Sequence, residues 1–196
     1  MATIPDAGLN ALATQVQSLI TYVAVGTGCG TLSSGLTSGN AYTTLALTTG
    51  LPANVAAAAS LTITDGTHNQ VVTVTGAGAL AGATSIPVVS FVASATFAPS
   101  ATGVVTTPQS SDLTLFNETS RLVATIGVAG AAAGESLNSA YFDPTTPSGV
   151  YVEVGYFGGA TASSSPNTGA LIARDIQFWN HVVNVDSASF QLDSTV

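Results

Sequence analysis

Short runs of β-forming residues, each ended by glycine, serine, asparagine or proline, recur along nearly the whole chain. The clearest pair is SLTIT (60–64) and QVVTVT (70–75), which flank DGTHN and predict a hairpin. Similar runs predict further strands at 20–28, 43–48, 85–92, 102–107, 121–129, 136–143, 150–159, 169–178 and 181–193. Many short strands separated by turns predict a mainly β fold, an antiparallel sandwich or barrel.

One segment near the start has helical spacing instead. Between residues 7 and 19, apolar side chains recur at Leu9, Leu12, Val16 and Leu19. Asp6 precedes this run and is a suitable N-cap. A short turn of helix is also expected around Glu118 and Arg121, which are three residues apart. We therefore expect a β fold with one N-terminal helix.

Charged side chains are rare, at 6% of the chain, whereas about 25% is usual for a soluble domain. There is no lysine, the only cations are Arg121 and Arg174, and ten carboxylates give a net charge of −8. Interface cores are depleted in charge, so this composition predicts a homo-oligomer, a trimer or a ring. It also predicts no binding to nucleic acid or to a membrane, because neither phosphate-rich partner would meet a basic patch.

The residues that could carry chemistry do not form a recognisable constellation. His68 lies in the predicted hairpin loop, where a solvated side chain is expected, and His181 follows Trp179 in an apparent turn, within reach of Asp175 or Asp186. A metal site would need three or four converging ligands. We therefore predict no enzyme, no catalytic or metal-binding residue, and no cofactor.

The two arginines are the informative residues, because a chain so poor in cations places both in β-rich segments. We predict that Arg121 pairs with Glu118 or Glu153, and that Arg174 pairs with Glu153 or Asp175. As structural ion pairs these would fix the register of the strands. The alternative is a set of exposed pairs that contribute little.

Aromatic residues gather in the second half of the chain. By strand parity, Tyr151 and Phe157 share one face, and Tyr156 takes the other. One face should fill the core, while Tyr151, Tyr156, Phe157 and Trp179 are candidates for a subunit interface. Burial of all of them in the core is the alternative. The single cysteine, Cys29, is expected to be buried and inert, with an intermolecular disulfide as the alternative.

Five segments occur in the order AGLNALA, ITYVAVGTG, DLTLFNETSR, YVEVGYFG and GALIARDI, over residues 7–28 and 111–178. This order resembles the N-terminal family of phage tail fibres, in which a helix precedes THxAxGxG, xTALxNExxR, REVGLFD and LIAR segments. The matching positions are Glu118 and Arg121 in the third segment, Glu153, Gly155 and Phe157 in the fourth, and Leu171, Ala173 and Arg174 in the fifth.

Residues 31–108 stand where that family has a short loop. The resemblance therefore implies a discontinuous body, residues 1–30 and 109–196, interrupted by an inserted small β domain at 31–108. Within the insert, GATSIPVVSFVASATF resembles a small β module found in phage virion proteins.

For function, the resemblance implies a bacteriophage virion structural protein of the tail fibre, baseplate or adaptor type. Such a protein would be assembled in the host bacterial cytoplasm, would be located in the virion, and would contact copies of itself and other virion proteins. The 196 residues include no long fibrous shaft, which leaves a capsid decoration (cement) protein as an alternative. A carbohydrate-binding host-attachment module is a second alternative.

Overall fold

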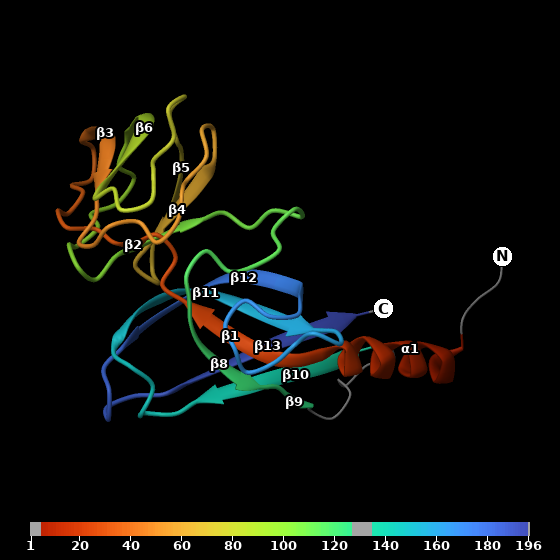
Figure 1. Cartoon of the computed structure of the whole chain (residues 1–196). Helices are drawn as coiled ribbons and strands as arrows, with labels where there is room; N and C mark the ends of the chain where they lie inside the picture. The colour runs from red at the N-terminus through yellow and green to blue at the C-terminus, as the bar shows by residue number, and fades with distance from the viewer. Residues whose placement is uncertain (1–4, 127–134, 196) are drawn as a thin grey trace.

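The computed structural model describes residues 5–126 and 135–195, and it confirms a mainly β fold with one N-terminal helix. Figure 1 shows a body of long strands with the helix at one end and a separate group of short strands on one side. All strand pairs are antiparallel.

Two sheets form the body. The larger has the order β12-β11-β1-β8, and its strands are β1 (Ile20–Gly26), β8 (Glu118–Val123), β11 (Gly149–Gly158) and β12 (Ala170–His181). The smaller has the order β13-β10-β9, and its strands are β9 (Thr125–Ile126), β10 (Glu135–Phe142) and β13 (Ala188–Thr195). Their facing sides enclose one apolar cluster that includes Phe142, Tyr151, Tyr156, Trp179 and Phe190. The body is therefore a β-sandwich.

The other strands form two small sheets. One has the order β2-β7-β4-β5 and the other pairs β3 with β6, with the bounds β2 (Gly30–Thr31), β3 (Ala41–Ala46), β4 (Ser60–Thr64), β5 (Asn69–Thr73), β6 (Ser85–Val92) and β7 (Gly103–Thr106). The predicted hairpin is present as β4 and β5. Within the described ranges, no sheet mixes these strands with those of the body. We call residues 31–108 the insert; its boundaries remain a prediction.

The predicted helix is present as α1 (Asp6–Leu19), but its start differs in detail. Pro5 occupies the N-cap position and makes no side-chain cap hydrogen bond. Asp6 is the first helical residue instead of the cap, and it still complements the positive end of the helix dipole.

The buried face of α1 matches the predicted apolar one only in part: Leu9 is half-buried, and the Val16 side chain lies outside what the structure describes. Ala13 and Gln17 are buried, whereas Leu12 and Leu19 are 45% and 53% exposed. Gln17 Nε2 donates to the carbonyl of Leu137 at 2.7 Å. The helix thus packs on the smaller sheet through a small side chain and a hydrogen-bonded amide, which leaves two leucines at the surface.

The helical turn predicted around Glu118 and Arg121 is wrong. Both residues belong to β8, where Gly26 is paired with Glu118 and Ala24 with Arg121. The strand contains an irregularity in its register between these two pairs. Pairing with β1 therefore overrides the local helical spacing.

The strand predicted over residues 181–193 is only partly correct. β12 ends at His181 and β13 begins at Ala188, with a turn between them. Val183 and Val185, whose alternation suggested a buried strand face, are 40% and 73% exposed. Hydrogen bonds to a neighbouring loop hold this segment as a turn, as described below.

The predicted faces of β11 need correction. Tyr151 and Tyr156 share the sandwich core, while Phe157 packs on the opposite side of the sheet. The cause is a break in register between Tyr151 and Glu153, which shifts the alternation by one residue. Tyr151, Tyr156, Phe157 and Trp179 are all at most 8% exposed, so in the single chain they are core residues, as the alternative has it.

Candidate functional site

Both arginines lie in one row of residues across the larger sheet. Arg121 on β8 is paired with Ala24 on β1, Ala24 with Gly155 on β11, and Gly155 with Arg174 on β12. A second row, paired in the same way, holds Glu118, Gly26 and Glu153. Small residues therefore separate the large charged ones, which leaves room above the sheet between the two arginines.

The chain segment that follows the insert fills this space. A Cβ atom added at Gly155 would lie 2.8 Å from Cδ2 of Leu115. A Cβ atom added at Gly26 would lie 2.5 Å from the carbonyl oxygen of Asn117 and 2.6 Å from Oε1 of Glu153. Glycine at these two strand positions permits the close approach of the segment to the sheet.

Glu153 is the centre of the first charged cluster. Its side chain is fully buried and accepts hydrogen bonds from Nε and Nη2 of Arg174, at 3.1 and 2.7 Å. It also accepts from the backbone N–H groups of Gly28, Phe116 and Asn117, at 3.3, 3.1 and 2.9 Å. Such a set satisfies a buried carboxylate and ties three separate segments of the chain to it.

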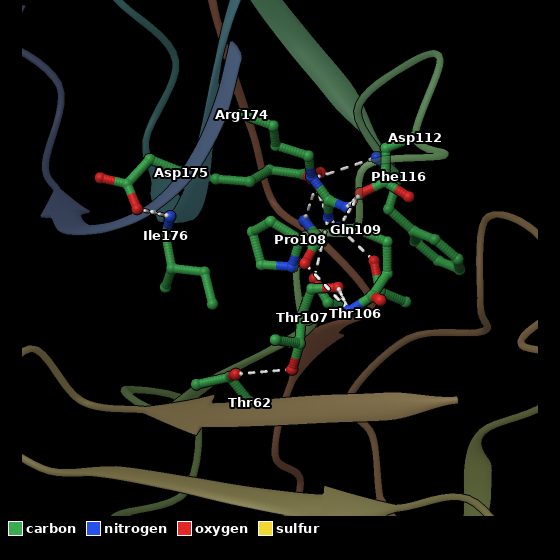
Figure 2. Close-up of polar contacts among 12 residues, drawn as sticks. Thr62, Thr106, Thr107, Pro108, Gln109, Asp112, Phe116, Arg174, Asp175 and Ile176 are labelled. Carbon is green, nitrogen blue, oxygen red and sulfur yellow. Dashed lines mark hydrogen bonds and ion pairs between the residues drawn. The ribbon is translucent and has the colours of Figure 1, made fainter. Parts of the chain in front are cut away.

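Arg174 extends the cluster to the insert. Its Nη1 donates to Oδ2 of Asp112 at 2.6 Å, and its Nη2 donates to the hydroxyl and carbonyl oxygens of Thr106, at 2.8 and 3.1 Å (Figure 2). Thr106 is the last residue of β7. We call Thr106, Asp112, Glu153 and Arg174 the junction cluster, because it joins the insert to the body.

Sequence reasoning identified only part of this cluster. Arg174 and Glu153 are paired as one predicted alternative has them, whereas Asp175 hydrogen-bonds Ile176 and Gln177 instead. Asp112 and Thr106 were not predicted. Asp112 lies 62 residues from Arg174 in a segment of irregular structure, and no sequence spacing indicates such a contact.

Glu118 and Arg121 form the second charged cluster. Two hydrogen bonds, 2.6 and 2.7 Å long, join their side chains in a bidentate pair. Arg121 Nη1 donates to the carbonyl of Thr168 at 2.8 Å, and the N–H of Asn167 donates to Glu118 at 2.8 Å. We call this pair the loop clamp, since it holds the loop between β11 and β12. The guanidinium also lies 4.0 Å from the ring centroid of Phe157, a cation–π contact.

The two clusters leave the molecular surface without cations. The Arg121 side chain is 1% exposed and that of Arg174 is 4% exposed, and the sequence has no other lysine or arginine. Exposed carboxylates remain, among them those of Asp143 and Asp175, and the Asp186 side chain is 40% exposed. The surface is therefore neutral and acidic, with no lysine or arginine side chain to complement it.

Surface pockets lie beside the junction cluster. One of about 420 Å³ is lined by Thr106, Gln109, Asp112 and Phe116, and a second of about 360 Å³ shares Asp112 and adds Arg174. Their polar groups are mainly hydrogen-bonded within the chain: Gln109 Nε2, for example, donates to the carbonyls of Thr107 and Pro108. This internal satisfaction suits a structural joint better than a ligand site.

His181 pairs with Asp186, one of its two predicted partners, but it lies in a strand and not in the predicted turn. It is the last residue of β12, is fully buried, and lies 4.3 Å from the Trp179 ring, centroid to centroid. Its Nδ1 pairs with Oδ1 of Asp186, and its Nε2 hydrogen-bonds the carbonyl of Thr146 at 2.7 Å. Desolvation acts to raise the pKa of Asp186, but hydrogen bonds from the Val182 N–H and His181 outweigh it and lower that pKa.

The remaining candidate residues, His68 and Cys29, belong to neither charged cluster. The His68 side chain is 52% exposed and pairs with Asp65 at 3.1 Å. Cys29 is fully buried, and burial, followed by the nearby charge of Glu153, raises its pKa to about 12. No group of three or more His, Cys, Asp or Glu residues that could hold a metal ion occurs in the described part of the chain.

Among the described residues, no helix is long and apolar enough to cross a bilayer. Comparison of the chain with family models, with curated proteins and with solved structures finds no match. The resemblance to phage tail-fibre N-termini therefore stays a prediction from the five sequence segments.

Proposed function

We propose that this chain is a bacteriophage virion structural protein of the tail fibre, baseplate or adaptor type. It acts as a passive, oligomeric part of the particle that binds copies of itself and other virion proteins. The observation that supports this is the burial of both arginines within the chain's own ion pairs. A surface without lysine or arginine is unusual for a free monomer and suits one that neighbours cover.

Exposed apolar side chains support self-association. On α1, Leu12 and Leu19 are 45% and 53% exposed, and on β8 Leu122 and Val123 are 36% and 70% exposed. Burial of such side chains stabilises a contact by about 25 cal/mol per Å² of apolar area. Contacts between copies through these residues would remove them from water.

The mass of the purified chain in solution tests self-association. Native mass spectrometry and light scattering should give a closed oligomer at micromolar concentration. The double variant Leu12→Ser, Leu19→Ser should shift the population towards the monomer. Val71→Ser is the matched control, since Val71 is 60% exposed on β5, and it should leave the mass unchanged. A wild-type chain that stays monomeric contradicts the proposal.

The place in the particle needs a separate measurement. Quantitative mass spectrometry of purified particles gives the copy number relative to the major capsid protein. A tail component should be present in few copies, whereas a capsid decoration protein, the alternative, should be present in a number comparable to that of the capsid subunits. Absence of the chain from washed particles contradicts both.

A further inference from the structure

The turn between β12 and β13 exposes three valines on a fixed backbone. We call residues 182–187 the tip loop. Val182, Val183 and Val185 in it are 52%, 40% and 73% exposed. Three exposed branched apolar side chains within four residues form a local apolar surface at a position where turns usually carry polar residues.

Hydrogen bonds fix the backbone of the tip loop. The N–H groups of Val182 and Val183 donate to Oδ1 of Asp186 and to Oγ of Ser148, at 3.1 and 2.8 Å. Those of Asn184 and Val185 donate to the carbonyls of Pro144 and Val182, at 2.6 and 3.1 Å. Since four successive N–H groups are satisfied, the loop offers side chains to a partner and would order little on binding.

The His181–Asp186 pair closes the base of the loop. Buried His181 bonds Asp186 within the loop and the Thr146 carbonyl in the neighbouring β10–β11 loop. Asn184 has a φ of 64°, a conformation that asparagine tolerates in turns. The sequence therefore specifies the shape of this loop although its three valines stay exposed.

Carboxylates flank the three valines. Asp186 is at the end of the tip loop, and exposed Asp143 directly precedes Pro144, whose carbonyl bonds the loop. A second copy of this chain would bring carboxylates to the contact but no exposed lysine or arginine, because Arg121 and Arg174 are both buried. Self-association therefore gives this surface no complementary charge.

We propose that the tip loop is a docking surface for a different protein, one whose surface combines an apolar pocket with lysine or arginine side chains. The valines would enter the pocket, and the cations would face Asp143 and Asp186. This inference deepens the proposed function, on which it rests, by naming the chemistry of one neighbour.

The test uses the full chain and a short fluorescent amphipathic peptide of leucine and lysine, with fluorescence anisotropy as the readout. The same peptide with glutamate in place of lysine is the charge control. The lysine peptide should bind the wild-type chain, less tightly as salt rises, and the glutamate peptide should not bind.

Variants assign the binding to the loop. Val183→Ser with Val185→Ser should weaken binding about tenfold or more. Val71→Ser with Val89→Ser removes two valines that are 60% and 53% exposed in the insert, and it should change binding less than about twofold. Melting curves verify that both variants are folded. Asp143→Asn, in the adjacent β10–β11 loop, should also weaken binding.

Equal binding of both peptides, or equal loss in both valine variants, overturns the inference, as does no binding of the lysine peptide. Native mass spectrometry of the same samples keeps this result separate from the proposed function. If the chain is an oligomer that does not bind the peptide, only the proposed docking surface is wrong. If it is a monomer that binds the peptide, only the proposed self-association is wrong.

Discussion

The insert and the body are built from different interactions. The buried core of the insert is almost entirely aliphatic, with Leu32, Leu45, Leu61 and Ile63 among its fully buried side chains and Phe97 as its one fully buried aromatic. Between residues 31 and 108 the only charged side chain is Asp65. The body combines an aromatic core with the loop clamp and most of the junction cluster.

This difference separates two ways of specifying a β structure. In the insert, alternation and turns place apolar side chains inside, and no buried charge is required. In the body, ion pairs join strands and loops that are distant in sequence, so each partner fixes the position of the other. The stability of the insert should therefore depend mainly on packing. The stability of the body should fall when a single charged partner is removed.

The largest expected effect is that of Arg174→Met, which leaves buried Glu153 without its cation. Removal of one partner from a buried pair costs about 3–5 kcal/mol, which corresponds to a fall in melting temperature of roughly 6–20 °C for a chain of this size. Differential scanning calorimetry measures it. Asp175→Asn is the control, since Asp175 is exposed and bonds only near neighbours, and it should have little effect. An unchanged melting temperature in Arg174→Met would show that the junction cluster does not stabilise the fold.

The next largest effect should come from the packing of residues 107–117 on the larger sheet of the body. Gly155→Ala places a Cβ 2.8 Å from Leu115 and should destabilise the chain by about 1–3 kcal/mol. Gly76→Ala in the insert is the matched control, because nothing lies within 4 Å of its Cβ, and it should be neutral or slightly stabilising. Urea unfolding of both variants measures the difference. Equal stability of the two would show that the segment does not press on Gly155.

Acid should weaken the body through two carboxylates in its loops. Hydrogen bonds from Thr145 lower the pKa of Asp143, and the pKa of Asp186 is lowered as described above. A lowered folded-state pKa gives stability that is complete above the ordinary value of 3.8 and is lost as the pH falls through the folded value. Melting temperatures from pH 6 down to about 2 should decline in this window. The Asp143→Asn, Asp186→Asn variant should show a flatter decline, and an unaltered pH profile counts against these contacts.

The smallest effect concerns Cys29, which reports on the boundary between the two regions. With its pKa raised to about 12 and its side chain fully buried, the thiol should not react with a maleimide at pH 8 in the folded chain. Urea should make it reactive. In Arg174→Met the reaction should be faster than in wild type, because Cys29 lies beside the junction cluster. Rapid labelling of the folded wild-type chain would mean that the contact between insert and body opens often enough to expose Cys29.

The strands were largely predictable from sequence, because turns and β-forming residues are local signals. The parity of β11 was not, since the bulge after Tyr151 arises from pairing with β12. Nor was the buried face of α1, where Gln17 is buried because it bonds a carbonyl of β10. Both failures have the same origin: a tertiary contact overrides a local pattern.

The charged clusters, too, were only partly predictable from sequence. The scarcity of cations indicated that Arg121 and Arg174 matter, and Glu118 and Glu153 were named as partners. The contact of Arg174 with Asp112 depends on how the segment after the insert crosses the sheet. Similarly, the alternating valines of the tip loop have the pattern of a strand, and hydrogen bonds within the loop and to the β10–β11 loop hold them in a turn.

We propose that this chain, whose two arginines are both buried, covers its exposed apolar side chains by contact with neighbours. The most direct test is the mass of the purified wild-type protein in solution, measured by light scattering across a dilution series. We expect a closed oligomer that persists to low concentration. A highly soluble monomer at every concentration, with Leu12 and Leu19 open to water, would contradict this expectation.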